Sequence, residues 1–350
     1  MSKIKVLIVD DSALVRQFIS QILAEDDEIE VIGTAIDPIF ALQRIMRAPP
    51  DVITLDVEMP RMDGLTFLEK MMKSSPIPII MISSYTQKGC ETTLKALELG
   101  AVDFINKPER NNLENLSVIK REIISKVKNA AKINLRKPGK AVKKEEIVLR
   151  PEADVNTVAP QQRNRKLVAI GASTGGVVAV RGVIEHLRPS RCSILISLHM
   201  PPGFTATFAK NLGANIGWRS FEGVDGQAVE PGTIYVAPGG KNMTLEKQNG
   251  RLFIGVKPCD LTDIYKPNVN KTFASVARSA GSGAVGVIMT GMGDDGAKGL
   301  LMMRQAGAIT IAQSQETCMV FGMPRKAIEA GAVDYVIPLD RMSAKIQQLI

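Results

Sequence analysis

The sequence predicts an α/β protein of two doubly wound parallel-sheet domains in series, the second carrying a small antiparallel insert. Two observations predict this class. Short continuous apolar runs alternate with amphipathic segments along residues 1–130, and the same alternation returns along residues 166–350. Runs of this kind are typical of parallel strands that helices cover on both faces. At 350 residues the chain is long enough to build two hydrophobic cores.

The first domain is predicted at residues 1–130, with five strands. Its apolar runs are IKVLIVD, EVIGTA, DVITLD, IPIIMIS and AVDFINK, and a helical pattern follows each of them. In an open parallel sheet, functional residues lie just beyond the carboxyl ends of the strands. We therefore expect the polar residues that end these runs to share one edge of the sheet.

Residues 131–165 are predicted to link the two domains. They hold the densest basic stretch of a chain whose formal net charge is +8, with almost no aromatic residues or apolar periodicity. Two interpretations stay open, a flexible, solvated linker and a docking surface for an acidic partner.

The second domain is predicted at residues 166–350. Its apolar runs are KLVAIGAS, CSILISLH, AVGVIMTG, AITIAQS and DYVIP. The stretch at about 218–258 is richer in Gly and Pro, and its short alternating runs, such as GTIYVAP and RLFIGV, predict the antiparallel insert.

The strand ends of the first domain carry three carboxylates, a hydroxyl and an amine. Asp10 and Asp11 close the first run and Asp56 the third, while Ser83 ends the fourth and Lys107 the fifth. Carboxylates brought together repel one another unless a cation joins them, and oxygen ligands favour Mg²⁺. The hydroxyl and the lysine would neutralise phosphoryl oxygens. The set predicts an acyl phosphate formed by nucleophilic attack of Asp56.

The alternative for any one of these residues is a structural role, since Asp11 alone could cap the helix that SALVRQFI predicts. The whole set, with the loop EMPRMDG after Asp56 and the dipeptide KP at 107–108, resembles the receiver domain of two-component response regulators over residues 3–128. The resemblance implies Asp56 as the phosphoacceptor and Ser83 with Lys107 as the switch pair. It implies four Mg²⁺ ligands, which are Asp10, Asp11, Asp56 and the backbone carbonyl of Glu58.

The glycine-rich turn IGASTGG, residues 170–176, could cradle a phosphate or expose a serine nucleophile. A phosphate loop needs Lys after the last glycine, and Val177 stands there instead. A dinucleotide-binding fold needs an acidic residue at the end of the next strand, which ends in His199. A histidine there suits a general base. These residues favour the nucleophile, Ser173.

A third strand end completes the set. The run AVGVIMT is followed by GMGDDG, which offers Asp294 and Asp295. Serine, histidine and aspartate at three strand ends can converge as nucleophile, base and orienting carboxylate. The other histidine of the chain, His186, lies near the end of a helical pattern, where we expect a structural role.

The motifs IGASTGG, HMPPGF, IYVAPGG, TGMGDDG and FGMPR resemble the catalytic domain of the chemotaxis protein-glutamate methylesterase family across about residues 166–345. The resemblance implies Ser173 as nucleophile, His199 as base and Asp295 as orienting acid. It also places Thr174 and the backbone N–H of Met292 near the oxyanion. The family usually has Asn at position 294, where this chain has Asp.

A receiver ahead of this domain implies a phosphorylation-activated hydrolase. Its substrates would be glutamate γ-methyl esters of methyl-accepting chemotaxis receptors, and it would also deamidate receptor glutamines. A histidine kinase of the chemotaxis system would donate the phosphate. Mg²⁺ is expected for receiver phosphorylation, and no cofactor for the esterase reaction. The family resemblance also implies that the receiver docks across the Ser173 strand ends and blocks them.

Two rival functions predict different sequence features. A DNA-binding response regulator would carry a helix-turn-helix, whereas the second half has a β/α pattern and diffuse charge, so no nucleic-acid partner is expected. An adaptor without hydrolase activity would carry the same residues in misaligned positions. No apolar run approaches ~18 residues, so no membrane insertion is expected. Four scattered cysteines and a start without a signal segment predict a cytoplasmic location.

Overall fold

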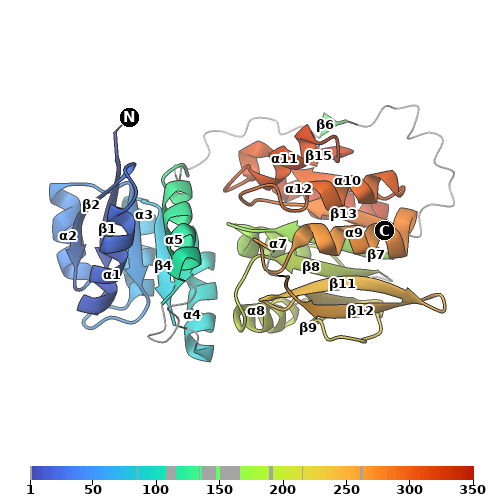
Figure 1. The fold of residues 1–350 in the computed structure, drawn as a ribbon, viewed down its shortest axis with the longest axis horizontal. Coiled ribbons are helices and arrows are strands. Elements are labelled where there is room, and N and C mark those ends of the chain that lie inside the picture. Colours follow the sequence, from blue (N-terminus) through green and yellow to red (C-terminus); the bar gives the residue numbers. More distant parts are fainter. Residues whose placement is uncertain are drawn as a thin grey trace. The chain divides into compact units, whose positions relative to one another are not determined.

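The structure is a computed structural model. It describes residues 2–84, 86–107, 116–133, 135, 147–149, 166–188, 192–214, 216–260 and 263–350. The chain divides into two compact units, Met1–Lys140 and Ala141–Ile350 (Figure 1). Most of the predicted linker lies outside the described residues. None of the described helices is both long and apolar enough to cross a membrane.

The first unit is a five-stranded parallel sheet with the strand order β2-β1-β3-β4-β5, which confirms the predicted class. The strands are β1 (Ile4–Val9), β2 (Ile29–Ala35), β3 (Val52–Asp56), β4 (Ile79–Ser83) and β5 (Asp103–Asn106). The helices, which Figure 1 shows on both faces of the sheet, are α1 (Ala13–Ala24), α2 (Pro38–Arg47), α3 (Gly64–Ser74), α4 (Gln87–Glu98) and α5 (Leu116–Ala130). The central strands β3 and β4 are wholly buried, as their continuous apolar runs require.

Side-chain caps start the helices soon after the strand ends. Ser12 accepts the N–H of Val15 at the start of α1, and Asp37 and Thr86 cap α2 and α4 in the same way. The cap of α1 is therefore Ser12 rather than Asp11. This leaves the Asp11 carboxylate available at the edge of the sheet.

The second unit is built on an eight-stranded sheet with the order β6-β15-β14-β13-β7-β8-β10-β9. Its neighbouring strands pair in parallel, apart from the antiparallel contact of β15 with β6 (Ile147–Val148). The other strands are β7 (Leu167–Ala172), β8 (Ser193–Leu198), β9 (Arg219–Glu222), β10 (Thr233–Val236), β13 (Ala284–Ile288), β14 (Ile309–Gln313) and β15 (Tyr335–Ile337). The helices are α7 (Gly176–Ile184), α8 (Phe204–Gly213), α9 (Val269–Ala280), α10 (Ala297–Gln305), α11 (Met323–Glu329) and α12 (Leu339–Leu349).

The antiparallel insert is present but smaller than the predicted stretch. Among the described strands of this stretch, β11 (Lys241–Gln248) and β12 (Arg251–Pro258) form the antiparallel pair, through a turn in which Asn249 and Gly250 have φ of 49° and 79°. The run GTIYVAP instead forms β10, which lies parallel between β8 and β9. All four residues of β10 are buried, so this run belongs to the main sheet.

Close packing brings α9 onto the central strand β7. A Cβ on Gly171 would lie 2.3 Å from the Cγ1 of Val269 and 2.9 Å from the ring of Phe273. Both of these side chains are fully buried. Glycine in β7 therefore lets the first turn of α9 approach the strand ends, where the candidate catalytic residues lie.

Candidate functional site

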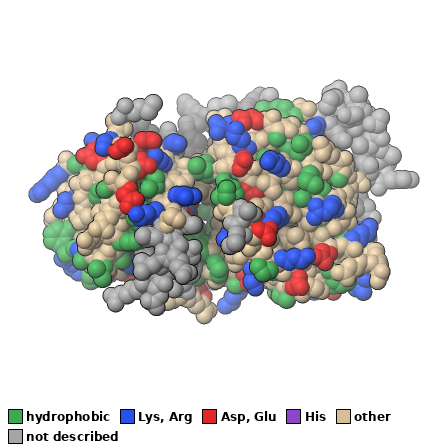
Figure 2. Space-filling model, viewed as in Figure 1, with side chains coloured by type: hydrophobic (Ala, Val, Ile, Leu, Met, Phe, Trp, Pro, Cys, Tyr) green, Lys and Arg blue, Asp and Glu red, His purple; other side chains and the backbone are tan. Residues whose placement is uncertain are grey.

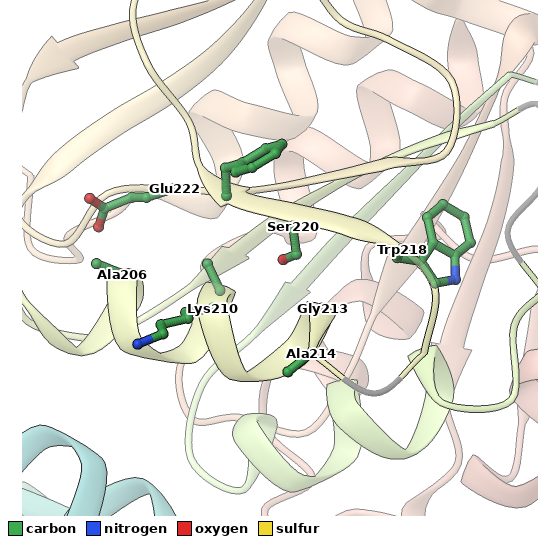
Figure 3. Close-up of a pocket in the computed structure, with 9 residues that line it drawn as sticks. Ala206, Lys210, Gly213, Ala214, Trp218, Ser220 and Glu222 are labelled. Carbon is green, nitrogen blue, oxygen red and sulfur yellow. The ribbon is translucent and has the colours of Figure 1, made fainter.

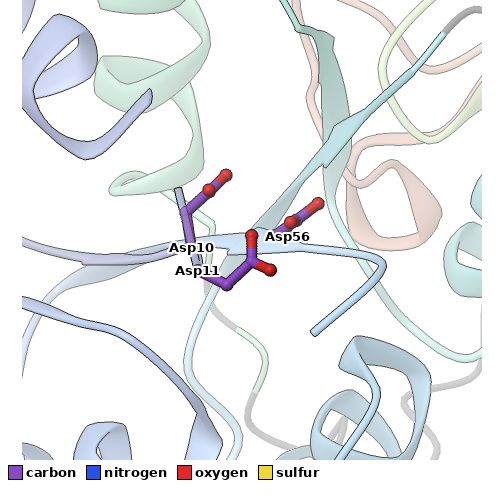
Figure 4. Close-up of side chains that lie close together, drawn as sticks. All are labelled: Asp10, Asp11 and Asp56. Carbon is purple, nitrogen blue, oxygen red and sulfur yellow. The ribbon is translucent and has the colours of Figure 1, made fainter. Parts of the chain in front are cut away.

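Three carboxylates gather at the carboxyl ends of β1 and β3. One oxygen from each of Asp10, Asp11 and Asp56 lies within 4.8 Å of the others (Figure 4). Asp10 and Asp56 are buried and Asp11 is exposed. The Oδ2 atom of Asp10 is buried without a hydrogen bond among the described residues. A buried carboxylate oxygen without a hydrogen bond, beside two further carboxylates, belongs to a set of oxygen ligands that fits Mg²⁺.

Lys107 joins this cluster from the end of β5. Its Nζ donates to Asp56 Oδ2 at 2.7 Å and lies 3.5 Å from Asp10 Oδ2. Burial raises the pKa of Asp56 to about 6, although the Lys107 hydrogen bond opposes the rise. Burial alone would lower the pKa of Lys107, but the two carboxylates outweigh it and raise that pKa. One lysine therefore only partly neutralises this buried acidic pocket.

The two remaining predicted residues of the first domain border the cluster. Ser83 ends β4 beside β3, and its Oγ accepts a hydrogen bond from Thr93 Oγ1 of α4 at 2.6 Å. The Glu58 side chain is exposed and pairs with Lys88 Nζ at 3.5 Å. The cation ligand predicted at this residue is its backbone carbonyl, so the ion pair of the side chain does not compete with that role.

In the second unit, Ser173 and His199 lie at the ends of neighbouring strands. Ala172 of β7 is opposite Leu198 of β8 in the register, and the N–H of His199 donates to the Ala172 carbonyl at 3.3 Å. On the other side of β7, the N–H of Ser173 donates to the carbonyl of Thr290 at 3.0 Å. Thr290 leads into the loop GMGDDG, so the three predicted strand ends meet at Ser173.

Asp295, rather than Asp294, contacts the imidazole. Its Oδ2 lies 2.8 Å from His199 Nε2, and the Asp295 side chain is only 1% exposed. The same carboxylate accepts the N–H groups of Val269 at 2.7 Å and Asn270 at 2.9 Å, in the first turn of α9. Backbone donors at a helix N-terminus stabilise a negative charge. Asp294 is exposed.

Glycines fix the turn that carries Ser173. Gly175 has a φ of 76° as the residue before α7, and a Cβ there would lie 2.7 Å from the Cβ of Met319. A Cβ on Gly291 would lie 2.8 Å from the Cβ of Ser173. The loop backbone thus reaches Ser173 one residue before Met292, which was predicted near the oxyanion.

The hydroxyl of Ser173 makes no hydrogen bond to any described residue. Hydrogen bonds between nucleophile and base often tighten only when substrate is bound. Thr174, the other residue predicted near the oxyanion, accepts a hydrogen bond at its carbonyl from Thr290 Oγ1 at 3.0 Å. His186 is exposed and lies just after the end of α7, where its Nδ1 is 2.8 Å from the carbonyl of Gly182 in that helix.

Sequence reasoning did not identify Tyr265, whose ring stacks on the imidazole of His199 with centroids 4.8 Å apart. The signal available was the segment KPNVN, in which Asn268 follows a proline and caps α9. That pattern predicts where α9 begins. It does not reveal that the preceding tyrosine turns toward the strand ends.

A shallow pocket of about 580 Å³ lies between α8 and β9 (Figure 3). Lys210 and small residues at α8 line one side, and Trp218, Ser220 and Glu222 line the other. None of the predicted site residues lines it. Figure 2 shows basic and acidic side chains interspersed over both units on the face in view, without the basic stripe expected of a nucleic-acid-binding surface.

Comparison with known proteins identifies relatives for both halves. The profile of the CheB methylesterase family matches residues 168–346, and that of the response regulator receiver domain matches residues 6–117. The protein-glutamate methylesterase/protein-glutamine glutaminase of Bordetella bronchiseptica is 46% identical over 99% of this chain and 97% of its own. The protein of the same name from Escherichia coli K12 is also 46% identical, with the same coverage. The crystal structure of the Thermotoga maritima CheB methylesterase catalytic domain is 38% identical, with a TM-score of 0.51. The match covers 53% of this chain and 98% of the Thermotoga maritima chain.

Proposed function

Because the chain belongs to the CheB methylesterase family and carries a receiver domain ahead of the catalytic domain, we propose that Ser173, His199 and Asp295 form its catalytic triad. The protein is a protein-glutamate methylesterase and protein-glutamine glutaminase. It removes methyl groups from glutamate γ-methyl esters of chemotaxis receptors, and deamidates receptor glutamines. A DNA-binding or adaptor role is not favoured, because near-full-length relatives are named as enzymes.

The contact between His199 and Asp295 carries the proposal. A buried carboxylate 2.8 Å from Nε2 fixes the ring and its tautomer. Since Nε2–H donates to Asp295, the lone pair lies on Nδ1, which is the nitrogen left to take the proton of Ser173. Asp295 then stabilises the imidazolium that forms.

The reaction proceeds through an acyl-enzyme. Ser173 Oγ attacks the ester carbonyl carbon as its proton passes to His199. The oxyanion receives backbone N–H groups from the Thr174 turn and from Met292, close to the N-terminus of α7. As the C–O bond to the methoxy group breaks, His199 gives its proton to that oxygen and methanol leaves. Water activated by the same base then hydrolyses the glutamyl ester. An amide follows the same path with ammonia as the leaving group.

In the receiver domain, Asp56 is the proposed phosphoacceptor. Asp10, Asp11 and Asp56, with the Glu58 carbonyl, would hold the Mg²⁺ that receiver phosphorylation requires. That ion would neutralise charge on the transferring phosphoryl group. Lys107 and Ser83 would contact the phosphoryl oxygens of the product. Since Ser83 now contacts Thr93 of α4, a move toward the phosphoryl group would break that hydrogen bond.

Receptors are the substrates and a histidine kinase is the phosphodonor class that the two domains imply. We assign the donor to the chemotaxis kinase. The division into a receiver at 1–130, a linker at 131–165 and a catalytic domain at 166–350 stays a prediction. So do the cytoplasmic location and the absence of a cofactor in the esterase reaction.

The test is release of methanol from methylated receptor membranes. Ser173→Ala and His199→Ala are each expected to lower it by about 10³-fold or more, because the catalytic residues act as a unit and the loss of one removes most of the rate enhancement. His186→Ala is the matched control and should retain activity, since its exposed imidazole contacts the Gly182 carbonyl of α7. Activity of the Ser173→Ala protein near that of the wild type would overturn the proposed triad.

A further inference from the structure

One face of the His199 imidazole is covered by the phenol ring of Tyr265. The ring centroids are 4.8 Å apart and the planes differ by 10°, so the two rings are stacked. Tyr265 is half-buried, and its hydroxyl makes no hydrogen bond to a described residue. The interaction is therefore between the two rings, and the hydroxyl does not fix it.

The loop that contains Asp295 fits against the edge of the Tyr265 ring. Gly293 has a φ of 88°, and a Cβ at this position would lie 2.2 Å from the Tyr265 hydroxyl oxygen. Glycine at 293 thus makes room for the phenol. The ring is confined by the imidazole on its face and by this loop at its tip.

The antiparallel hairpin anchors the segment that carries Tyr265. Asn242 of β11 is buried, and its Nδ2 donates to Asp263 Oδ2 at 2.7 Å. The Oδ1 of the same side chain accepts the N–H of Asn268 at 3.0 Å. Lys271 Nζ, from α9, lies 2.8 Å from Asp263 Oδ2. One amide therefore holds the segment on both sides of Tyr265.

We propose that Tyr265 is a positioning residue of the esterase reaction, which orients the His199 ring and stabilises the imidazolium that forms as Ser173 attacks. The proposal rests on the proposed function of His199 as the base. A cation is attracted to the face of an aromatic ring, and a neutral imidazole is attracted less. Because the charge develops only during the reaction, the contact stabilises the transition state more than the ground state.

The charges around the pair are consistent with this role. Asp295 lies at the edge of the imidazole, and Asp294 lies near the phenol. Burial raises the pKa of Tyr265, and both carboxylates raise it further. The phenol thus stays neutral, and its face remains available to the cation.

The test compares Tyr265→Leu, which removes the ring, with Tyr265→Phe, which keeps it. Tyr265→Met serves as a second variant without a ring if the leucine variant does not fold. Ile264→Ala is the control for disturbance of the segment, since Ile264 is 86% exposed. Methanol release from methylated receptor membranes gives kcat and KM. Ring-proton NMR shifts of His199 report the stack directly, and they are easily assigned because the chain has two histidines.

Tyr265→Leu is expected to lower kcat by about 10- to 100-fold, because a small misplacement of a catalytic group is costly, with KM changed by less than about twofold. The His199 ring protons should move downfield as they lose the ring current. Tyr265→Phe and Ile264→Ala should match the wild type in both measurements. A leucine variant with unchanged kcat, or a phenylalanine variant as slow as the leucine one, would overturn the inference.

Separate variants test the role of Tyr265 and the proposed triad, so one can be wrong without the other. If His199→Ala keeps its activity, the proposed triad is wrong, whatever the Tyr265 variants do. If His199→Ala is inactive while Tyr265→Leu is fully active, the triad stands and only the role of Tyr265 is lost.

Discussion

Asp295 Oδ2 lies 2.8 Å from the Nε2 of His199, and two backbone N–H groups of α9 share the same carboxylate. The two backbone N–H groups donate to the carboxylate, and Nε2–H of His199 donates to it in the proposed tautomer. An ionised carboxylate offers enough lone pairs for three donors. The first turn of α9 therefore helps to hold the Asp295 carboxylate in position beside the His199 ring.

Asp295→Asn is expected to lower methanol release by about 10⁴-fold. An amide presents one oxygen and one NH₂ group to three donors. Its NH₂ would either meet a backbone N–H or donate to Nε2 and force the proton onto Nδ1. In the second case Nδ1 can no longer accept the proton of Ser173. The measurement is single-turnover methanol release, with folding checked by thermal unfolding.

Asp294→Asn is the matched control for that substitution. Asp294 is exposed, so its amide should be tolerated within about threefold of the wild-type rate, as for ordinary surface changes. The opposite ranking of the two variants would assign the orienting role to Asp294.

Gly291→Ala should damage the site because the added Cβ would clash with residues around Ser173. The added Cβ would lie 2.4 Å from Met323 Sδ and 2.8 Å from Ser173 Cβ, so the serine must shift. We expect a loss of about 10²-fold in kcat and about 1–3 kcal/mol in the free energy of unfolding. Gly182→Ala, in α7, meets nothing within 4 Å and should raise stability by about 0.4–1 kcal/mol with unchanged activity. Equal activity in both variants would contradict this explanation.

Much of the fold could be predicted because its strands are continuous apolar runs with polar residues at their ends. All five runs of the first domain form strands, and the prediction of a five-stranded parallel sheet is confirmed. The predicted extent of the insert was wrong, because the sequence of the four residues of β10 fits both a short alternating strand and a buried parallel strand. Which of the two forms depends on the strands that flank these residues, and this is set by the tertiary structure.

The candidate site likewise contains residues that could be predicted from the sequence and one that could not. Ser173 and His199 directly follow strands, and Asp295 lies in the loop after a strand, so their meeting could be predicted from topology. Tyr265 could not, because its position depends on hydrogen bonds between β11 and the segment before α9, which are distant in sequence. Roles for all four residues stay predictions until the variants are measured.

The acidic cluster predicts a pH dependence of stability in the receiver. Burial raises the pKa of Asp56 to about 6 from 3.8, so the folded state binds more protons than the unfolded state between these values. Stability should therefore fall as pH rises from about 4 to about 6 and stay flat above. Burial raises the pKa of Asp10 as well, so Asp56→Asn should reduce this fall rather than abolish it, with a gain on the order of 3 kcal/mol at pH 8. Calorimetry of the full chain at several pH values measures it.

Asp27→Asn, at an exposed carboxylate, is the control and should leave the pH profile unchanged. Mg²⁺ should raise the stability of the wild type above pH 6, because it binds the ionised carboxylates. It should do so less for Asp56→Asn. An equal gain from Mg²⁺ in both proteins would place the cation elsewhere.

The last prediction concerns why a receiver precedes an esterase. Receptor methyl esters lie on a large protein, so Ser173 must be accessible, and the family resemblance implies that the resting receiver blocks it. Phosphorylation of Asp56 adds about two negative charges, which Lys107 and Ser83 can meet. Because Ser83 is bonded to Thr93 of α4, that response would alter the α4 surface. A difference of only ~1.4 kcal/mol in docking free energy would give tenfold activation, so a strong switch needs more.

The fragment 160–350 contains the whole eight-stranded sheet apart from its short edge strand β6, so it should fold and can be measured alone. It is expected to release methanol faster than the unphosphorylated full chain and to ignore a small-molecule phosphodonor. The full chain should respond to the donor, and its Asp56→Asn variant should stay at the resting rate. A fragment no faster than the resting full chain would exclude release from occlusion. The receiver would then act by stimulating the catalytic domain directly or by recruiting the receptor.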